Sequence, residues 1–239
     1  MNIILFSPPE VELPLSRQDA RARHILKVLR SVPGDRFDVG LIDGPRGKAT
    51  LLEVRDDTLH LSFAWGDPPP PLAPLHLILG LPRPQTARDL LRENTSLGVA
   101  AMDFVRTERA EASYAGSSLW SSGEWHQLLL AGAAQAFCTR LPVVHSGRSL
   151  TEAVASLSGG GCRLALDNYE ASIGLAELAL PGSGNACLAF GAERGWSDAE
   201  RALLRANGFQ FVHLGPRVLR METACIAAVT LVKAKRGWA

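Results

Sequence analysis

The first 65 residues carry short runs in which apolar residues predominate, a pattern typical of β-strands. Turn signals such as Asp43-Gly44-Pro45 separate these runs. Residues 16–30 instead carry apolar residues at helical spacing, with Ser16 as the expected cap and Ile25, Leu26 and Leu29 on one side. Several short strands with one helix predict a small β-barrel. The predicted strands are residues 2–6, 36–42, 48–54 and 58–65.

From residue 75 onward, short apolar runs alternate with helical patterns. Runs such as "RLALD" and "ACLAF" are apolar throughout their centres, which is typical of parallel strands covered on both faces. Ser197 and Glu200 form a capping box that opens a helix, and Gly208 closes it. This half is therefore predicted to be an α/β domain. The predicted strands are 75–81, 101–106, 163–167, 186–190 and 209–215, and the other predicted helices are 87–98, 124–137 and 224–232.

The two patterns meet at "GDPPPPLAP", residues 66–74, which holds five prolines in nine residues. Proline fixes φ and removes a backbone donor, so this segment can form neither a helix nor a central strand. We therefore predict two domains, residues 1–68 and 72–239.

Composition narrows the possible classes of protein. The net charge of +1 over 239 residues means that any nucleic-acid site must be a local patch. No signal peptide is expected at "MNIILFSPPE", and no run approaches the roughly 20 apolar residues of a membrane span. The cysteines show no CxxC spacing, which predicts neither a zinc site nor a disulfide framework and favours a reducing cytoplasm. They are Cys138, Cys162, Cys187 and Cys225.

Ligands of open parallel sheets bind beyond the carboxyl ends of the strands, and that rule selects the loops after Asp167, Phe190 and Leu214. The second loop, "GAERGWSDAE", has Gly191 and Gly195 for close backbone approach, and it opens a helix whose free N–H groups suit an acceptor-rich ligand. It matches neither a dinucleotide nor an ATP fingerprint. An ordinary strand-to-helix turn rich in glycine is an equally good interpretation.

The third loop, "GPRVLRMET", places Arg217 and Arg220 between a buried strand and a buried helix. Guanidinium groups bind phosphate and carbonyl-type oxygens with two parallel hydrogen bonds, so this pair indicates a binding or catalytic site. The alternative is structural: the arginines are solvated, and Glu222 or Thr223 caps the helix.

The residues of this loop resemble the C-terminal signature of the ribosomal RNA small subunit methyltransferase E family, of the SPOUT class, whose pattern is L-G-x-R-I-L-R-x-E-T-A. Val218 replaces the isoleucine of that pattern. The stretch "GAERGW" resembles the family's G-P-E-G-G-[FW], and residues 22–44 resemble its N-terminal H-x-x-x-V-L-R…G-D…D-G pattern. The sequence departs from the family at residues 83–96 and 131–138, and at Ala192 and Arg194. The C-terminal matches are Leu214, Gly215, Arg217, Leu219, Arg220, Glu222, Thr223 and Ala224.

This resemblance implies a PUA-like, RNA-binding β-barrel over residues 1–68 and a SPOUT trefoil-knot methyltransferase domain over residues 72–239. It also implies a cytoplasmic homodimer that binds S-adenosylmethionine, needs no metal and no membrane, and methylates N3 of one uridine in 16S ribosomal RNA of the small subunit. The residues implied to bind the cofactor are Leu166, Gly191, Glu193, Gly195, Leu214, Gly215, Val218, Leu219 and Thr223.

Three residues are the expected catalytic groups. Arg220 is the first choice, and Arg217 the second, for stabilising the negative charge on the uracil oxygens when N3 loses its proton. Glu222 is the candidate acceptor of that proton, although a capping role fits it equally well.

Cations around the N-terminal helix form the expected RNA surface. Residues 17–36 hold six basic and two acidic side chains, a local surplus of four positive charges. An ordinary solvated helix face is the alternative. The residues predicted to bind RNA are Arg17, Arg21, Arg23, His24, Lys27, Arg30 and Arg83.

Two further functions stay open at this point. The departures at residues 83–96 and 192–194 are compatible with a catalytically inert RNA-binding or ribosome-assembly factor of the same fold. They are also compatible with a knotted methyltransferase that acts on another RNA.

Overall fold

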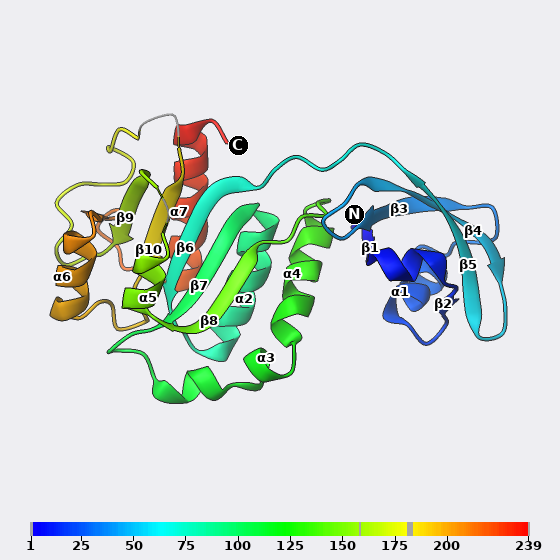
Figure 1. Cartoon of the computed structure of the whole chain (residues 1–239), viewed down its shortest axis with the longest axis horizontal. Coiled ribbons are helices and arrows are strands. Elements are labelled where there is room, and N and C mark those ends of the chain that lie inside the picture. The colour runs from blue at the N-terminus through cyan, green and yellow to red at the C-terminus, as the bar shows by residue number, and fades with distance from the viewer. Residues whose placement is uncertain (1, 158, 181–183, 239) are drawn as a thin grey trace. The chain divides into compact units, whose positions relative to one another are not determined.

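The structure, a computed structural model, describes residues 2–157, 159–180 and 184–238 (Figure 1). The chain packs into two compact units. The first comprises Met1–Pro71 with Ala133–Leu141, and the second comprises Leu72–Gly132 with Pro142–Ala239. The backbone N–H of Asp43 donates to the carbonyl of Thr139 at 2.8 Å, and Thr139 Oγ1 donates to the carbonyl of Gly44. These bonds attach a distant segment to the first unit, which the hydrophobic pattern did not predict.

The first unit is built on a five-stranded sheet in the order β1-β3-β4-β5-β2. The β1–β3 pair is parallel and the other pairs are antiparallel. The apolar sides of its strands and the side chain of Ile25 form one core. All four predicted strands are confirmed to within two residues, and β2 is additional. The strands are β1 (Ile4–Phe6), β2 (Leu15–Ser16), β3 (Arg36–Leu41), β4 (Arg46–Val54) and β5 (Thr58–Trp65), with a 3₁₀ turn η1 (Pro8–Glu12) after β1.

The single helix predicted over residues 16–30 is wrong in three respects. Ser16 is not its cap but lies in β2, paired with Thr58 of β5. The helix α1 (Ala20–Arg23) begins after Asp19, whose side chain accepts from the Arg21 N–H. A π-helical turn, η2 (His24–Val28), follows directly. Because a π turn bonds i to i+5, it rotates the following side chains off the α-helical stripe, and Leu29 is 43% exposed.

Arg21 is held by two carboxylates in this unit. Its guanidinium lies 2.5 Å from Glu10 Oε1 and 2.7 Å from Asp19 Oδ2. The hydrogen bond from Arg21 is the largest cause that lowers the pKa of Glu10 to about 2, and the same guanidinium lowers the pKa of Asp19.

This ion pair predicts acid sensitivity. A carboxyl group whose pKa is lower in the folded state contributes stability above its ordinary pKa of 4.5, and that stability is lost as the pH falls toward 2. We therefore expect the free energy of unfolding of the wild type to fall more steeply between pH 4.5 and pH 2 than that of Glu10→Gln. Urea denaturation at a series of pH values measures this difference. Glu12→Gln, which removes the same charge from an exposed neighbour, is the control, and equal slopes for wild type and Glu10→Gln would contradict the prediction.

The second unit contains a six-stranded sheet in the order β11-β9-β10-β6-β7-β8, and every neighbouring pair is parallel. The parallel sheet predicted from the apolar runs is confirmed. The edge strand β8 was missed because none of its seven residues is buried, so its sequence "VVHSGRS" lacks an apolar run. The strands are β6 (Ala73–Gly80), β7 (Val99–Arg106), β8 (Val143–Ser149), β9 (Cys162–Leu166), β10 (Ala186–Phe190) and β11 (Gln210–Val212).

Helices cover both faces of this sheet (Figure 1). On one face α5 (Leu150–Ala155) and α6 (Asp198–Ala206) pack on a core that includes Ile78, Ala189 and Trp196. Towards the other face, α7 (Met221–Arg236) packs against α2 (Pro84–Ser96) and β10. The capping box that opens α6 is confirmed, since Ser197 Oγ accepts from the Glu200 N–H at 3.1 Å. The remaining helices are η3 (Ala112–Gly116), α3 (Ser118–Ser121) and α4 (Glu124–Gln135).

The order of strands determines which loops can meet. Strands β11, β9 and β10 are consecutive neighbours and run in the same direction. Their carboxyl ends therefore lie at one edge, and the three loops that follow them are adjacent although up to about fifty residues separate them in the chain. The trefoil knot implied by the family resemblance stays a prediction.

Candidate functional site

The loops after β9, β10 and β11 enclose a cavity of about 200 Å³, which we call the edge cavity. All three loops were selected from the sequence as ligand-binding loops. The cavity is walled by apolar side chains such as Leu166, Phe190 and Leu214, by the ring of Tyr169, and by the backbone of the glycine-containing loop. This combination of apolar walls, exposed backbone and the arginines Arg194 and Arg217 suits a ligand with both a flat apolar part and charged groups.

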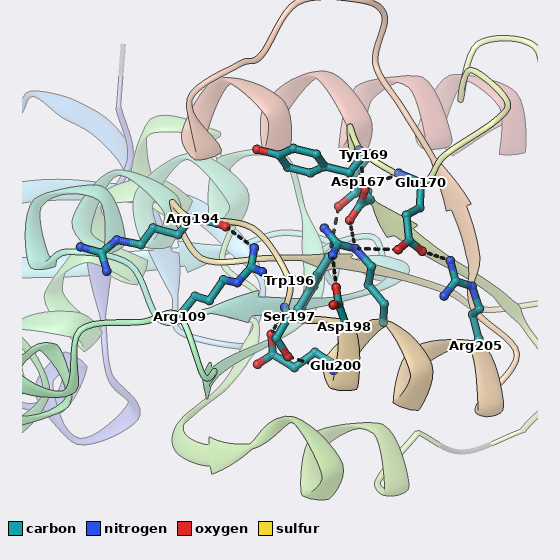
Figure 2. A network of polar contacts seen from close by, with 12 residues as sticks. Arg109, Asp167, Tyr169, Glu170, Arg194, Trp196, Ser197, Asp198, Glu200 and Arg205 are labelled. Atoms are coloured by element: carbon teal, nitrogen blue, oxygen red, sulfur yellow. Dashed lines mark hydrogen bonds and ion pairs between the residues drawn. The ribbon is translucent and has the colours of Figure 1, made fainter.

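The loop after β9 is held by Asp167, which lines the edge cavity (Figure 2). Its Oδ1 accepts from the backbone N–H groups of Tyr169 at 2.6 Å and Glu170 at 2.8 Å. Its Oδ2 accepts from Arg201 Nε at 2.8 Å, and both side chains of this ion pair are at most 5% exposed. Asp167 therefore links the loop to helix α6 through a desolvated charge pair.

The loop after β10 contributes residues 190–196 to the cavity. It approaches β6 so closely that a Cβ on Gly80 would lie 2.4 Å from the backbone nitrogen of Ala192. Within the loop, a Cβ on Gly191 would lie 2.9 Å from the carbonyl carbon of Gly195, and Gly195 itself has φ +71°. These glycines are required by close backbone approach and by a left-handed turn, which the sequence indicated for Gly191 and Gly195 but not for Gly80.

Contacts from other elements fix this second loop. Arg109, after β7, donates through Nη1 to the carbonyl of Arg194 at 3.1 Å (Figure 2). The backbone N–H of Arg83 donates to Glu193 Oε1 at 3.1 Å. Trp196 is fully buried and its Nε1 donates to the carbonyl of Leu166 at 3.2 Å, so it connects the second loop to the first.

The loop after β11 contributes Leu214, Arg217, Val218 and Leu219. Gly215 allows the turn with φ +107°, and its N–H donates to His213 Nδ1 at 3.1 Å. Val218 is 84% exposed, an unusual position for an apolar side chain that lines a cavity. An exposed apolar wall of this kind is expected where a ligand completes the packing.

Most of the residues predicted to bind a cofactor come together here. Seven of the nine line the edge cavity, whereas Gly215 and Thr223 are not among its described lining residues. The seven are Leu166, Gly191, Glu193, Gly195, Leu214, Val218 and Leu219.

Only one of the three predicted catalytic residues lines the edge cavity. Arg217 lines the edge cavity, whereas the exposed Arg220 is the N-cap of α7 and Glu222 lies in that helix's first turn. The alternative that Glu222 or Thr223 caps α7 is wrong, because the N-cap position belongs to Arg220 and carries no side-chain cap bond. Glu222 still suits the positive end of the helix dipole.

Several lining residues were missed. Asp167 was treated only as the end of an apolar strand, and Trp196 only as part of a family motif, whereas Trp196 serves both the core and the cavity wall. An acidic residue directly after an apolar parallel strand was the available signal. The other missed lining residues are Asn168, Tyr169, Phe190, Ala192, Arg194, Met221 and Ala224.

The predicted RNA-binding residues of the first unit differ in exposure and in whether their side chains already bond within the protein. Arg23, Lys27 and Arg30 are exposed, and His24 is half-buried. Arg21 is committed to Glu10 and Asp19, and Arg17 donates to the carbonyls of Arg55 and Asp56. In the second unit, the seventh residue, Arg83, is exposed at the start of α2.

Among residues 2–157, 159–180 and 184–238, no cluster of three or more His, Cys, Asp or Glu could hold a metal ion. No helix in the same ranges is long and apolar enough to cross a membrane.

Comparison with known proteins gives matches along nearly the whole chain. Residues 68–233 match the model of an RNA methyltransferase domain, and residues 18–64 match that of an RNA methyltransferase PUA domain. Ribosomal RNA small subunit methyltransferase E of Treponema pallidum is 37% identical, over 98% of this chain and 91% of the relative. Its namesake from Bacillus subtilis is 26% identical over 87% of this chain and 85% of that protein.

Solved structures share the fold. That of ribosomal RNA small subunit methyltransferase E from Neisseria gonorrhoeae bound to S-adenosyl methionine is 25% identical, with a TM-score of 0.79 over 97% of both chains. A putative methyltransferase from Legionella pneumophila has a TM-score of 0.80 at 23% identity over 98% of both chains. These matches, together with the three-loop cavity, show that the chain belongs to the ribosomal RNA small subunit methyltransferase E family of RNA methyltransferases.

Proposed function

We propose that this protein transfers a methyl group from S-adenosylmethionine to N3 of one uridine in 16S ribosomal RNA. The observation that carries the proposal is the edge cavity, in which the two loops that resemble the family's motifs meet the loop after β9. The Neisseria gonorrhoeae relative, whose structure contains S-adenosyl methionine, supports the choice of methyl donor.

The cavity's own residues fit such a donor. Gly80, Gly191 and Gly195 keep side chains out of the space beside the second loop, so its backbone groups can contact an adenine ring. Leu214, Val218 and Leu219 provide an apolar wall. When bound, S-adenosylmethionine supplies an electrophilic methyl group on a sulfonium sulfur, a chemistry for which the protein needs no metal.

The remaining chemistry falls to the protein. Uridine N3 must lose its proton, and the negative charge then spreads over the uracil oxygens, where a guanidinium stabilises it. The cavity reverses the order expected from the sequence: Arg217 becomes our first candidate and Arg220, outside the lining, the second. Glu222 and Thr223 keep only a supporting place in this proposal.

The first unit is proposed to hold the RNA. Arg23, His24, Lys27 and Arg30 provide the most accessible part of a phosphate-binding surface, with Arg17 and Arg21 beside them. Its match to an RNA methyltransferase PUA domain supports this role. The proposal also includes a homodimer and a trefoil knot in the second unit, because both are expected of the family.

Arg217→Ala should lower methyl transfer to 16S ribosomal RNA about 100-fold, because removing one preorganised donor to a developing anion typically has that effect. Arg220→Ala, which removes the same charge three residues later, is the matched control and should have a smaller effect. Incorporation of labelled methyl groups into ribosomal RNA measures both. A larger loss in Arg220→Ala would restore the order predicted from the sequence.

Mapping of methylated uridines in ribosomal RNA from cells with and without the gene tests the reaction itself. We expect a single N3-methyluridine in 16S RNA to disappear with the gene. A methyl group lost from a different RNA would identify a methyltransferase of other specificity. Absence of S-adenosylmethionine binding in a calorimetric titration would instead indicate an inert RNA-binding factor.

A further inference from the structure

A second cavity, of about 240 Å³, lies beside the edge cavity and has no part in the function described so far. Glu193 and Arg194 line both cavities, so the two share a wall. We call the second one the arginine cavity. Its lining residues are Arg83, Arg109, Glu111, Tyr114, Glu193 and Arg194.

The sheet topology explains why these residues meet. Arg83 follows β6, Arg109 follows β7, and Glu193 follows β10, and these three strands are neighbours in the order β10-β6-β7. Their carboxyl ends share the edge at which the edge cavity lies. Tyr114, in η3, adds a half-buried aromatic ring. A group bound in the arginine cavity would therefore lie next to the methyl-donor site.

The side chains that line the arginine cavity could form hydrogen bonds to an imide, the group at the N3 edge of uracil. Uracil presents an acceptor, a donor and an acceptor along one edge: O4, N3–H and O2. The complementary set is a carboxylate between cationic donors. The arginine cavity holds three guanidinium groups and two carboxylates, a net charge of +1. The carboxylates would repel a phosphate, whereas one of them can accept the N3–H bond of a base.

The arginine cavity is also partly preorganised. Arg83 Nε donates to Thr86 Oγ1 at 3.2 Å, and Arg109 Nη1 donates to the carbonyl of Arg194 at 3.1 Å. Each of these bonds engages a single nitrogen of a guanidinium that carries five N–H donors. The backbone N–H of Arg83 holds Glu193 Oε1, which positions the carboxylate on the shared wall.

We propose that the arginine cavity receives the uracil ring of the target nucleotide, an inference that rests on the proposed methyl transfer to N3. Tyr114 offers a face for stacking, as aromatic side chains do for unpaired RNA bases. Glu193 accepts the N3–H bond and takes that proton. Arg83 and Arg109 donate to O2 and O4 of the resulting anion. N3 then bonds to the methyl carbon as the carbon–sulfur bond breaks, with its electron pair passing to sulfur.

Glu193→Gln separates recognition from proton transfer. Glutamine keeps an oxygen for the Arg83 N–H and for N3–H but is not a base. We expect kcat to fall about 100-fold, as for loss of a general base, with KM for RNA changed less than about threefold. An unchanged kcat would overturn the role of Glu193.

Arg109→Ala and Tyr114→Ala should each raise KM for RNA about tenfold, whereas Tyr114→Phe should behave as wild type. Arg163→Ala, which removes a positive charge at the opposite edge of the sheet, is the control. Calorimetry with S-adenosylmethionine accompanies each variant. If Arg109→Ala weakens donor binding as much as RNA use, Arg109 only holds the second loop and the inference fails for it.

Competition by RNA carrying cytidine at the target position tests which part of the RNA is bound. Cytidine has no N3–H and presents a donor in place of O4, so it should bind the wild type about tenfold more weakly than uridine RNA, with a smaller difference in Arg109→Ala. Equal binding of both RNAs to the wild type would indicate a phosphate site and overturn the inference. This assay measures binding alone, so it remains decisive even if the wild type transfers no methyl group, a result that would defeat the proposed function instead.

Discussion

Gly80→Ala should strongly weaken the binding of S-adenosylmethionine. The added Cβ would lie 2.4 Å from the backbone nitrogen of Ala192 and 2.9 Å from the carbonyl carbon of Gly191. Backbone atoms cannot rotate away, so the whole loop that lines the edge cavity must shift. Overpacking of this kind costs about 1–3 kcal/mol, and because the displaced atoms form the binding site we expect affinity to fall about 100-fold or more.

Calorimetric titration with the donor, together with a thermal melt of the free protein, measures this effect. Gly160→Ala is the matched control, because a Cβ at Gly160 meets nothing within 4 Å and its φ lies outside the left-handed region. The control should bind the donor as the wild type does. Normal donor binding by Gly80→Ala would mean that the second loop does not form the site.

Arg201→Leu should destabilise the protein by about 3–5 kcal/mol, the usual cost of leaving one partner of a buried ion pair without the other. The Asp167 carboxylate is 2% exposed and would lose the bond from Arg201 Nε. Because Asp167 also holds the backbone N–H groups of Tyr169 and Glu170 at the cavity wall, donor affinity should fall as well.

Urea denaturation compares Arg201→Leu with Arg205→Ala, a change four residues later in α6. Arg205 pairs with Glu170 at the surface, where their side chains are 51% and 36% exposed. Surface pairs contribute less than about 1 kcal/mol, so this control should be nearly neutral. Equal destabilisation by the two changes would show that burial of the Asp167–Arg201 pair is not what stabilises α6 and its neighbouring loop.

The sequence alone predicted the parallel sheet and the edge at which ligands bind. Strands such as β10 are apolar at every position, and a strand buried on both faces needs that pattern whatever surrounds it. The roles of the glycines in residues 191–195 and of the capping box at Ser197 could also be predicted from the sequence, because backbone geometry and helix ends depend on residues close in the chain.

Local patterns failed where distant segments pair. Ser16 looks like a helix cap, but antiparallel pairing with Thr58 draws it into a strand. Edge strand β8 is too polar to recognise and is held by β7. Segment 133–141 returns to the first unit through hydrogen bonds to residues some ninety positions earlier.

For the site, the sequence determined the motifs and the tertiary structure decided which of their side chains share a cavity. Arg217 and Arg220 lie in the same motif, yet only Arg217 lines the edge cavity, whereas Arg220 is the exposed N-cap of α7. The arginine cavity joins the ends of β6, β7 and β10, which only the order of strands in the sheet makes neighbours. The type of each side chain is given directly by the sequence, whereas which side chains come together depends on long-range strand pairing.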